Sequence, residues 1–321
     1  MLIYNRCLNA AIQMYAGQPL RSMTRTRKPA SRTRRRSPAA RPASRLYRFF
    51  RALFVSSIVS FGAATIALGP KFSMSPADPL GRLGWPHQTE VAALPGDTAE
   101  VVQTRFSDCP EFFPPGRMPA VPARSGLREL CFSSFAILHN GQTKTPVVVA
   151  ERLNRAHVTQ AQGLQRTDKF YAEARLPVGE RAELTDYRGS GYSRGHMAPA
   201  GDMASAEGMA QSFSLANMVP QDQKHNAGAW SRIEQDTRKY ALRAAGDVYV
   251  LTGPVYSAKP EHIGRGVAVP QTLFKVVYDA TTHHAWVHWQ DNNSATKAQA
   301  PISYAEFVER TGMQLLPSSA R

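Results

Sequence analysis

The stretch from Asp186 to Met203 reads DYRGSGYSRGHMAPAGDM, and we expect the rest of the fold to be organised around it. It places one histidine, His196, between a glycine-rich approach and a proline-containing exit. Glycine lets a backbone turn sharply or approach a ligand closely. The planar guanidinium of Arg194 can bind two phosphate oxygens at once, and His196 can accept a proton near neutral pH. The stretch therefore predicts a site suited to phosphate chemistry.

A second stretch, from Asn217 to Glu234, reads NMVPQDQKHNAGAWSRIE. Within it, Asn226 and Glu234 carry side-chain oxygens of the kind that hard cations such as Mg²⁺ prefer. Asn226 follows His196 by 30 positions, and Glu234 follows Asn226 by 8. Together the two stretches offer a base, a phosphate ligand and donors for a metal ion.

Five residues at these spacings carry a family resemblance: Arg194, Gly195, His196, Asn226 and Glu234. The pattern resembles the DNA/RNA non-specific endonucleases of the ββα-metal, or His-Me finger, class, which includes endonuclease G and secreted bacterial nucleases. The resemblance extends from about Cys109 to Gly312. It implies an α+β fold in which helices flank a central, largely antiparallel sheet. One position departs from the pattern, because Ser193 stands where the family usually has Asp.

The resemblance implies a Mg²⁺-dependent endonuclease, with Mn²⁺ as an alternative metal, that cleaves DNA and RNA with little sequence preference. His196 would be the general base, Asn226 the metal ligand, and Glu234 would contact the metal through a water. The residues alone leave other roles open, because Asn226 could cap a helix that begins there. Glu234 could instead pair with Arg238 at i+4. Members of the family are often homodimers.

Arginines are the candidates for holding the substrate. Arg166, in QRTDKF, lies where the family places an arginine that stabilises the transition state. Arg194 would contact phosphate, or would support its loop through a carboxylate. Arg238 is a further candidate for substrate binding. We predict a catalytic set of His196, Arg166, Glu234 and Arg194.

The serine at position 193 keeps other functions open. A serine can accept a hydrogen bond but brings no negative charge, which puts in doubt how His196 is oriented. The main alternative is a non-catalytic nucleic-acid-binding protein on a degenerate nuclease fold. Further alternatives are a membrane-tethered structural protein and a phosphodiesterase that acts on a smaller substrate.

Charge is unevenly distributed along the 321 residues, whose formal net charge is +15. Residues 1–77 hold 14 of the 39 Lys and Arg residues and no Asp or Glu. The 25 basic and 24 acidic residues that remain nearly balance. Nucleic acid would therefore have to bind a local patch, because the folded part has no strong overall field.

The basic N-terminal part predicts a targeting segment. We predict a disordered basic leader at 1–51, a signal-peptide h-region or membrane anchor at 52–69, a linker at 70–108 and the endonuclease domain at 109–321. Translation could begin at Met1 or at Met23. Export to the periplasm, or anchoring to the inner membrane with the domain outside the cytoplasm, is the first expectation. The alternative is a mitochondrial presequence, because the leader is rich in Arg and free of acidic residues.

Cys109 and Cys131 are 22 positions apart and form a disulfide candidate if the domain is exported. In a reducing compartment they would be two buried thiols. The sequence has no CxxC motif and no Cys/His spacing typical of zinc sites.

Hydrophobic patterns predict the main elements of an α+β domain. We expect strands at 133–140, 145–153, 248–255, 273–278 and 285–290, and helices at 204–213 and 226–245. The first two strands should form a hairpin around Asn140-Gly141. A capping box of Ser303 and Glu306 should open a last helix that ends before Gly312.

Overall fold

The computed structural model describes residues 101–321. The predicted leader, the uncharged segment at 52–69 and nearly all of the predicted linker lie outside the described residues. From residue 101 to residue 321, no helix combines the length and the apolar character that crossing a membrane requires.

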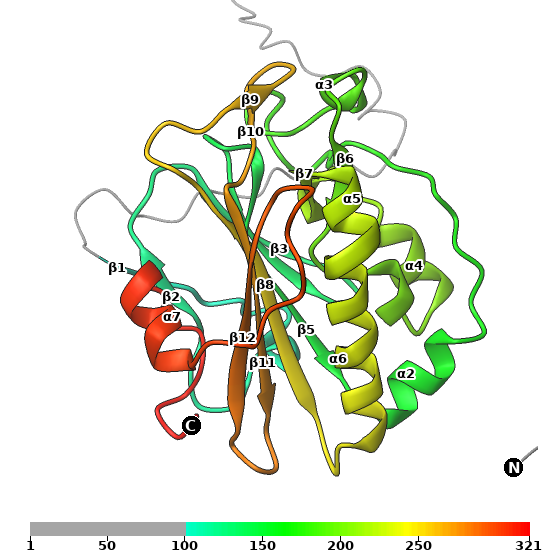
Figure 1. The fold of residues 1–321 in the computed structure, drawn as a ribbon, viewed down its shortest axis with the longest axis vertical. Coiled ribbons are helices and arrows are strands. Elements are labelled where there is room, and N and C mark those ends of the chain that lie inside the picture. Colours follow the sequence, from blue (N-terminus) through cyan, green and yellow to red (C-terminus); the bar gives the residue numbers. More distant parts are fainter. Residues whose placement is uncertain (1–100) are drawn as a thin grey trace, which may run out of the picture. The chain divides into compact units, whose positions relative to one another are not determined.

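A six-stranded antiparallel sheet forms the centre of the domain, in the order β12-β11-β8-β5-β4-β3 (Figure 1). Its strands are β3 (Leu127–Cys131), β4 (Ala136–Asn140), β5 (Thr145–Leu153), β8 (Val248–Val255), β11 (Thr272–Asp279) and β12 (Ala285–Asp291). The predicted hairpin is confirmed, because β4 and β5 pair antiparallel. The predicted strands near the C-terminus are confirmed too, since β11 pairs with β8 on one side and with β12 on the other. The fold is the expected α+β class.

Shorter elements surround this sheet. Three two-stranded pairs are β1 (Val101–Gln103) with β2 (Ala120–Pro122), β6 (Ser193–His196) with β7 (Met218–Gln221), and β9 (His262–Ile263) with β10 (Val267–Ala268). The helical segments are η2 (Pro110–Phe112), α2 (Arg155–Ala161), α3 (Leu184–Tyr187), η3 (Ala200–Asp202), α4 (Ala206–Gln211), η4 (Leu215–Asn217), α5 (Gln223–His225), η5 (Asn226–Trp230), α6 (Ser231–Arg243) and α7 (Tyr304–Thr311). Strand β1 precedes Cys109, the predicted start of the domain.

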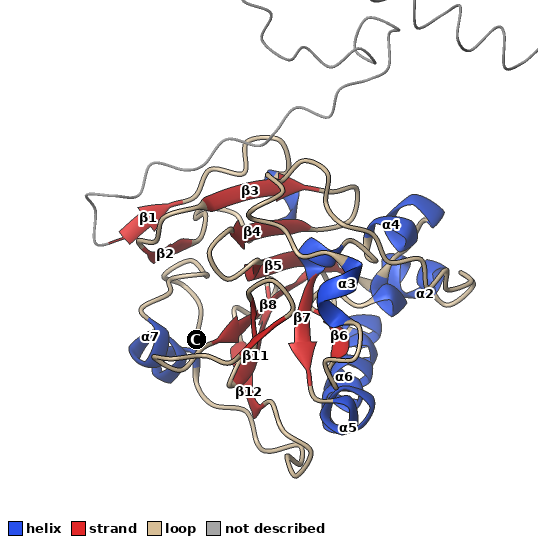
Figure 2. Ribbon diagram, turned by 90° about the horizontal axis from the view of Figure 1, so that it is seen from above, coloured by secondary structure: helices blue, strands red, loops and turns tan. Residues whose placement is uncertain are grey.

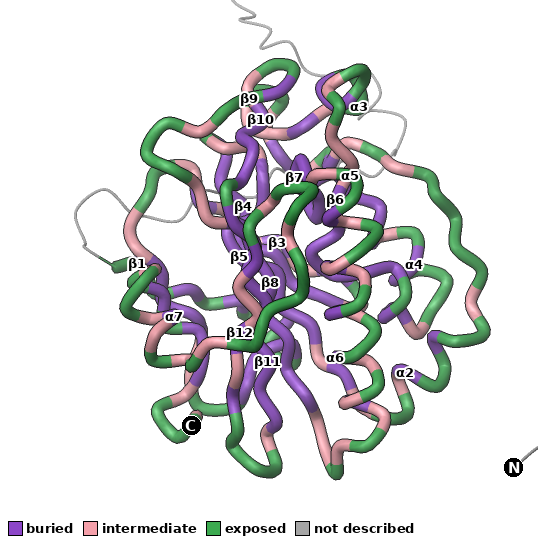
Figure 3. The backbone as a smooth tube through the Cα atoms, in the orientation of Figure 1, coloured by how far each residue is buried: buried purple, intermediate pink, exposed green. Residues whose placement is uncertain are grey.

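The two faces of the sheet are covered by different helices. Helix α6 lies on one face together with α2, α4 and α5, and α7 lies on the other (Figure 2). On the α7 face, the ring of Phe274 packs 4.9 Å from that of Phe307. On the α6 face, Trp230 and Ile233 pack against Val149. The strands between these layers are buried along most of their length (Figure 3).

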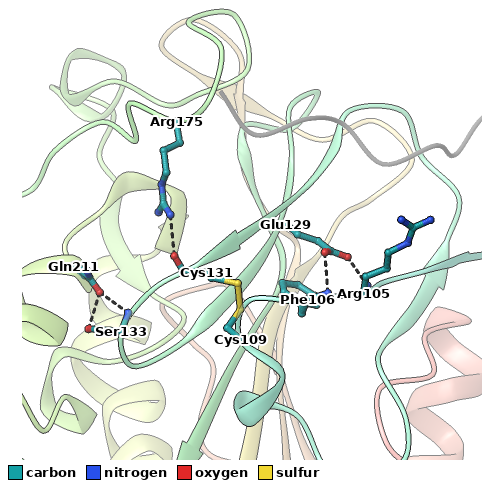
Figure 4. The surroundings of a disulfide bond; sticks show 8 residues. All are labelled: Arg105, Phe106, Cys109, Glu129, Cys131, Ser133, Arg175 and Gln211. Atoms are coloured by element: carbon teal, nitrogen blue, oxygen red, sulfur yellow. Dashed lines mark hydrogen bonds between the residues drawn. A yellow bond between two sulfur atoms is a disulfide. The ribbon is translucent and has the colours of Figure 1, made fainter. Parts of the chain in front are cut away.

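The ends of the domain are fixed by local interactions. Cys109 and Cys131 form a disulfide, as predicted (Figure 4). Helix α7 begins at Ser303, whose hydroxyl accepts a hydrogen bond from the amide of Glu306 at 3.1 Å, and ends at Gly312 with φ 68°. The reciprocal half of the predicted capping box does not form, because the Glu306 carboxylate pairs with Arg310 instead.

Candidate active site

The β6–β7 pair sets the position of His196, the last residue of β6. His196 pairs with Met218, and Gly195 pairs with Val219. A Cβ at position 195 would lie 2.1 Å from Oε1 of Gln221. Glycine is therefore required at this position, because any side chain would displace Gln221 or separate the two strands.

His196 is enclosed by aromatic rings. It is 8% exposed, and its ring lies 5.1 Å from Phe213 and 5.8 Å from Phe170. Its Nε2 is buried and has no hydrogen-bond partner within residues 101–321. Burial, reinforced by the positive charge of Arg166, lowers the pKa of His196 to about 3. The imidazole is therefore neutral at physiological pH and able to accept a proton.

The segment that follows His196 is held in place by Asn217. The Oδ1 of Asn217 accepts a hydrogen bond from the amide of Ala198 at 2.9 Å. Its Nδ2 donates to the carbonyls of Ala198 and Ser212, both at 2.9 Å. Asn217 is completely buried. This one side chain thus joins the exit of β6 to the end of α4.

The side chain of Asn226 does not cap a helix, so the predicted alternative, a structural role as a helix cap, is wrong. The cap belongs to Asp222, whose Oδ1 accepts hydrogen bonds from the amides of Lys224 and His225, both at 2.9 Å. Asn226 lies inside the continuous helical segment, with φ −57° and ψ −51°. Its side chain has no hydrogen-bond partner in the part of the chain that the structure describes.

A π-helical turn explains the spacing of eight between Asn226 and Glu234. Residues eight apart in an α-helix point about 80° apart, whereas residues seven apart point only about 20° apart. In η5 the amide of Ser231 donates to the carbonyl of Asn226, an i→i+5 bond that takes up one extra residue. Asn226 and Glu234 therefore lie nearly on one face, as an i, i+7 pair would.

Glu234 interacts with the buried charges of Glu151, Asp202 and Lys275 and with the partly buried Arg238. Burial raises the pKa of Glu234 to about 7, against the opposing effect of the Lys275 ammonium. The predicted alternative of a Glu234–Arg238 pair is wrong, because Arg238 binds Asp202 instead, with Nη1 2.6 Å from Oδ1. The Glu234 carboxylate has no hydrogen-bond partner among the described residues and remains available to a ligand.

Arg166 and Arg194 both approach His196. The Arg194 guanidinium lies 4.0 Å from the centre of the Phe170 ring, and that of Arg166 lies 5.0 Å from the centre of the Phe213 ring. Arg166 is half-exposed and pairs with Asp168 at 2.6 Å. Arg194 has no ion pair with any residue from 101 to 321, so the structure does not give it the predicted alternative of a carboxylate partner. Both arginines are close enough to lower the pKa of His196.

Three buried charged residues near the site were missed in the sequence: Glu151, Asp202 and Lys275. Both carboxylate oxygens of Glu151 are buried without a partner, and burial raises its pKa well above the usual range. The Lys275 ammonium donates to Thr252 at 2.8 Å and lies 5.5 Å from the Trp230 ring. For Glu151 and Lys275, the available signal was a charge inside the apolar runs TPVVVAERL and TLFKVVYD.

The residues present suit a magnesium ion. An amide oxygen on Asn226 and a carboxylate on Glu234, both without protein partners, are the donor types that Mg²⁺ prefers. Across residues 101–321, no group of three or more His, Cys, Asp or Glu side chains is placed to hold a metal ion. This small donor set fits Mg²⁺, which keeps several of its waters and uses one or two protein ligands.

Known nucleases are among the proteins that this chain resembles in sequence. The human mitochondrial nuclease EXOG is 33% identical over 165 residues, which cover 48% of this chain and 44% of that protein. Mitochondrial nuclease 1 of Schizosaccharomyces pombe is 35% identical over 150 residues, which cover 42% of this chain and 46% of that protein. The matching segment thus spans less than half the length of these two relatives.

A solved structure shares the fold. The crystal structure of the EndoG/EndoGI complex contains a chain that superimposes with a TM-score of 0.56 at 25% sequence identity. The match covers 66% of this chain and 91% of the other. The sequence profile of the DNA/RNA non-specific endonucleases matches residues 116–318, more than half of the chain. With this profile match, the chain belongs to the DNA/RNA non-specific endonuclease family.

Proposed function

We propose that this protein is a Mg²⁺-dependent endonuclease that hydrolyses the phosphodiester bonds of DNA and RNA with little sequence preference. The single observation that carries the proposal is that His196 and Glu234 share Arg166 as a charged neighbour. The π-turn of the helix that carries Glu234 presents Asn226 on the same face. Family membership and the nuclease names of the relatives support the same conclusion.

His196 would act as the general base. Its imidazole is neutral at physiological pH, so it can take a proton from an attacking water. Nε2 is enclosed by protein, which leaves Nδ1 as the nitrogen for this step. The rings of Phe170 and Phe213 enclose the imidazole of His196, and Asn217 holds the backbone segment that follows it. In the absence of the family's usual Asp at position 193, these contacts would have to support His196.

Asn226 would hold Mg²⁺ directly and Glu234 would hold it through a bound water. When bound, the metal would neutralise charge on the scissile phosphate and on the leaving 3′-oxygen. Arg166 and Arg194 would bind phosphate oxygens, because their guanidinium groups flank His196. Arg238 is held by Asp202, so its role would be to position Glu234 and not to bind substrate.

Phosphate groups are the same at every nucleotide, so the proposed contacts of Arg166 and Arg194 would not distinguish one base sequence from another. They support cleavage with little sequence preference.

The disulfide supports a non-reducing destination for the domain. Export, with residues 52–69 as signal or anchor, remains our proposal. The alternative is mitochondrial, because several relatives are mitochondrial nucleases and the leader is basic and free of acidic residues.

The test uses the full-length chain, supercoiled plasmid and single-stranded RNA. We expect both polymers to be cleaved with Mg²⁺ and to survive in EDTA. His196→Ala and Asn226→Ala should each reduce cleavage by about a hundredfold or more. His284→Ala, which changes an exposed histidine on a distant loop, is the matched control and should cleave normally.

Two results would contradict this proposal. Cleavage that survives both EDTA and His196→Ala would show that the site lies elsewhere. Salt-sensitive binding of nucleic acid without cleavage would favour the degenerate, non-catalytic alternative, and Ser193→Asp would then be the variant to examine for restored activity.

A further inference from the structure

A cavity of about 370 Å³ lies beside the disulfide, at the end of β3. Its walls include Phe132, Tyr171, Arg175 and Gln211. Figure 4 shows Arg175 reaching down to the carbonyl of Cys131, with Gln211 bound to Ser133 nearby. This volume falls within the range of small-ligand sites, which is about 300–1,000 Å³.

The cavity and the active site share one segment of chain. Phe170 contacts His196 with its ring, and the next residue, Tyr171, lines the cavity. The backbone of Tyr171 bonds to Phe213 at 3.3 Å and to Leu215 at 2.8 Å. Phe213 is also in contact with His196, at 5.1 Å between ring centres. Along the chain, the cavity residue Tyr171 is therefore the direct neighbour of Phe170, whose ring packs on His196.

Arg175 is prepared for stacking and not for binding phosphate. Each of its three nitrogens donates a hydrogen bond: Nε and Nη2 to Glu173 at 2.8 and 3.1 Å, and Nη1 to the carbonyl of Cys131 at 2.8 Å. The carboxylate of Glu173 also neutralises its charge. One face of the guanidinium lies 4.3 Å from the centre of the Phe132 ring. Its opposite face is the recognition surface that remains.

We propose that this cavity binds the nucleobase of a nucleotide next to the scissile phosphodiester. The base would stack on the Arg175 guanidinium and against Tyr171, whose side chain is exposed (38%) for an aromatic residue. Arginine planes and aromatic rings are the surfaces on which single-stranded bases stack. The inference rests on the proposed nuclease function and assigns a subsite to it.

The polar groups of the cavity are already used, which makes the subsite tolerant of sequence. The Oε1 of Gln211 accepts from the amide and the hydroxyl of Ser133, at 2.7 and 2.8 Å. Its Nε2 donates to Glu207 at 3.0 Å. A base in the cavity would thus meet stacking surfaces but few free donors or acceptors, and every base has a face that can stack.

The experiment fixes the position of cleavage. Short single-stranded oligonucleotides would carry one ordinary phosphodiester among methylphosphonate linkages, with an abasic site placed in turn on each side of it. In the wild-type protein, loss of the base at one flanking position should lower kcat/KM about tenfold. In Tyr171→Ala the rate should already be lower, and loss of that base should have little further effect. Tyr171→Phe keeps the ring and should behave as wild type.

Controls separate this subsite from the proposed function. Methyl p-nitrophenyl phosphate has no base, so Tyr171→Ala should cleave it as the wild type does, whereas His196→Ala should not. Ala174→Leu, which fills the cavity from another wall, should reproduce the loss of base dependence. An abasic effect at no position, or one that is equal in wild type and Tyr171→Ala, overturns the subsite alone. Failure of the wild type to cleave the intact oligonucleotide overturns the nuclease proposal as well.

Discussion

The two faces of the central sheet are built from the same strands but differ in chemistry. On the α7 face, side chains such as Leu138, Leu251 and Phe274 are apolar and completely buried. On the α6 face, the same strands bury Glu151 and Lys275. One face can therefore be understood from packing alone, whereas the other places charges where packing alone would exclude them.

The buried charges of the α6 face lower the stability of the fold, and they lie beside the candidate active site. Burying a charge without full pairing is unfavourable, and Glu151 has no hydrogen-bond partner for either oxygen. The raised pKa values of Glu151 and Glu234 are the direct expression of that cost. The apolar side chains buried on the α7 face, with Cys109 of the disulfide among them, carry no such cost.

The largest effect on stability should come from the α7 face. Phe274→Ala would remove a fully buried ring that packs on Phe307, and should lower the free energy of unfolding by about 3–5 kcal/mol. Urea denaturation measures this loss, with Phe274→Leu as the conservative control. Cleavage per folded molecule, assayed well below the melting temperature, should not change. A large fall in that rate would show that the two faces are not independent.

The disulfide should have the next largest effect. Cys109→Ser combined with Cys131→Ser would release a loop with a sequence separation of 22, and we expect a loss of about 3 kcal/mol in the free energy of unfolding. A reducing agent should lower the stability of the wild type toward that of the double variant, whereas the double variant should give matching values with and without it. Cys7→Ser, which changes the third cysteine of the chain, serves as control. A double variant as stable as the wild type would show that the disulfide does not stabilise the domain.

The smallest expected effect is a gain in the free energy of unfolding, from a substitution on the α6 face. The pKa of Glu234 rises from 4.5 to about 7 on folding, so the folded protein binds a proton that the unfolded chain releases between these pH values. Without Mg²⁺, stability should therefore fall as pH rises through this range. Glu234→Gln has no carboxyl group to ionise at this position. It should therefore be more stable than the wild type at pH 8, by about 1–3 kcal/mol in the free energy of unfolding. At pH 4 the advantage should disappear.

Denaturation in EDTA at both pH values measures this difference. Glu309→Gln changes an exposed carboxylate on α7, on the other side of the sheet, and it controls for a general effect of charge removal. An advantage for Glu234→Gln that is equal at pH 4 and pH 8 would mean that Glu234 does not carry the burial cost assigned to it.

The sheet could be predicted because its strands are runs of apolar and β-branched residues. The smaller elements could not. Strand β6 is only four residues long and contains Gly195, so it has too little periodicity to be distinguished from a loop. Helix α2 was not among the predicted helices, although Asn154, which accepts a hydrogen bond from the amide of His157 at 3.0 Å, is a typical residue for the start of a helix.

The site was predictable to the extent that its residues lie close together in the sequence. His196, Asn226 and Glu234 occupy two short stretches with fixed spacing. Glu151 and Lys275 come from strands more than 100 positions apart, so only the sheet brings them together. The nucleobase cavity has the same origin, because Phe132 and Arg175 meet only after β3 has formed its edge of the sheet.

The π-turn at 226–230 affects how such sites can be aligned between chains. A regular α-helix would present the same two oxygen donors at a spacing of seven, and here the spacing is eight. Deleting Gly228, which is exposed, would let the turn revert to an α-helix and would preserve the pair. Deleting one residue between Trp230 and Glu234 would rotate Glu234 by about 100° away from Asn226. A deletion of one residue therefore preserves the Asn226–Glu234 pair when it falls in the π-turn, and separates the two side chains when it falls in the α-helical turn that follows.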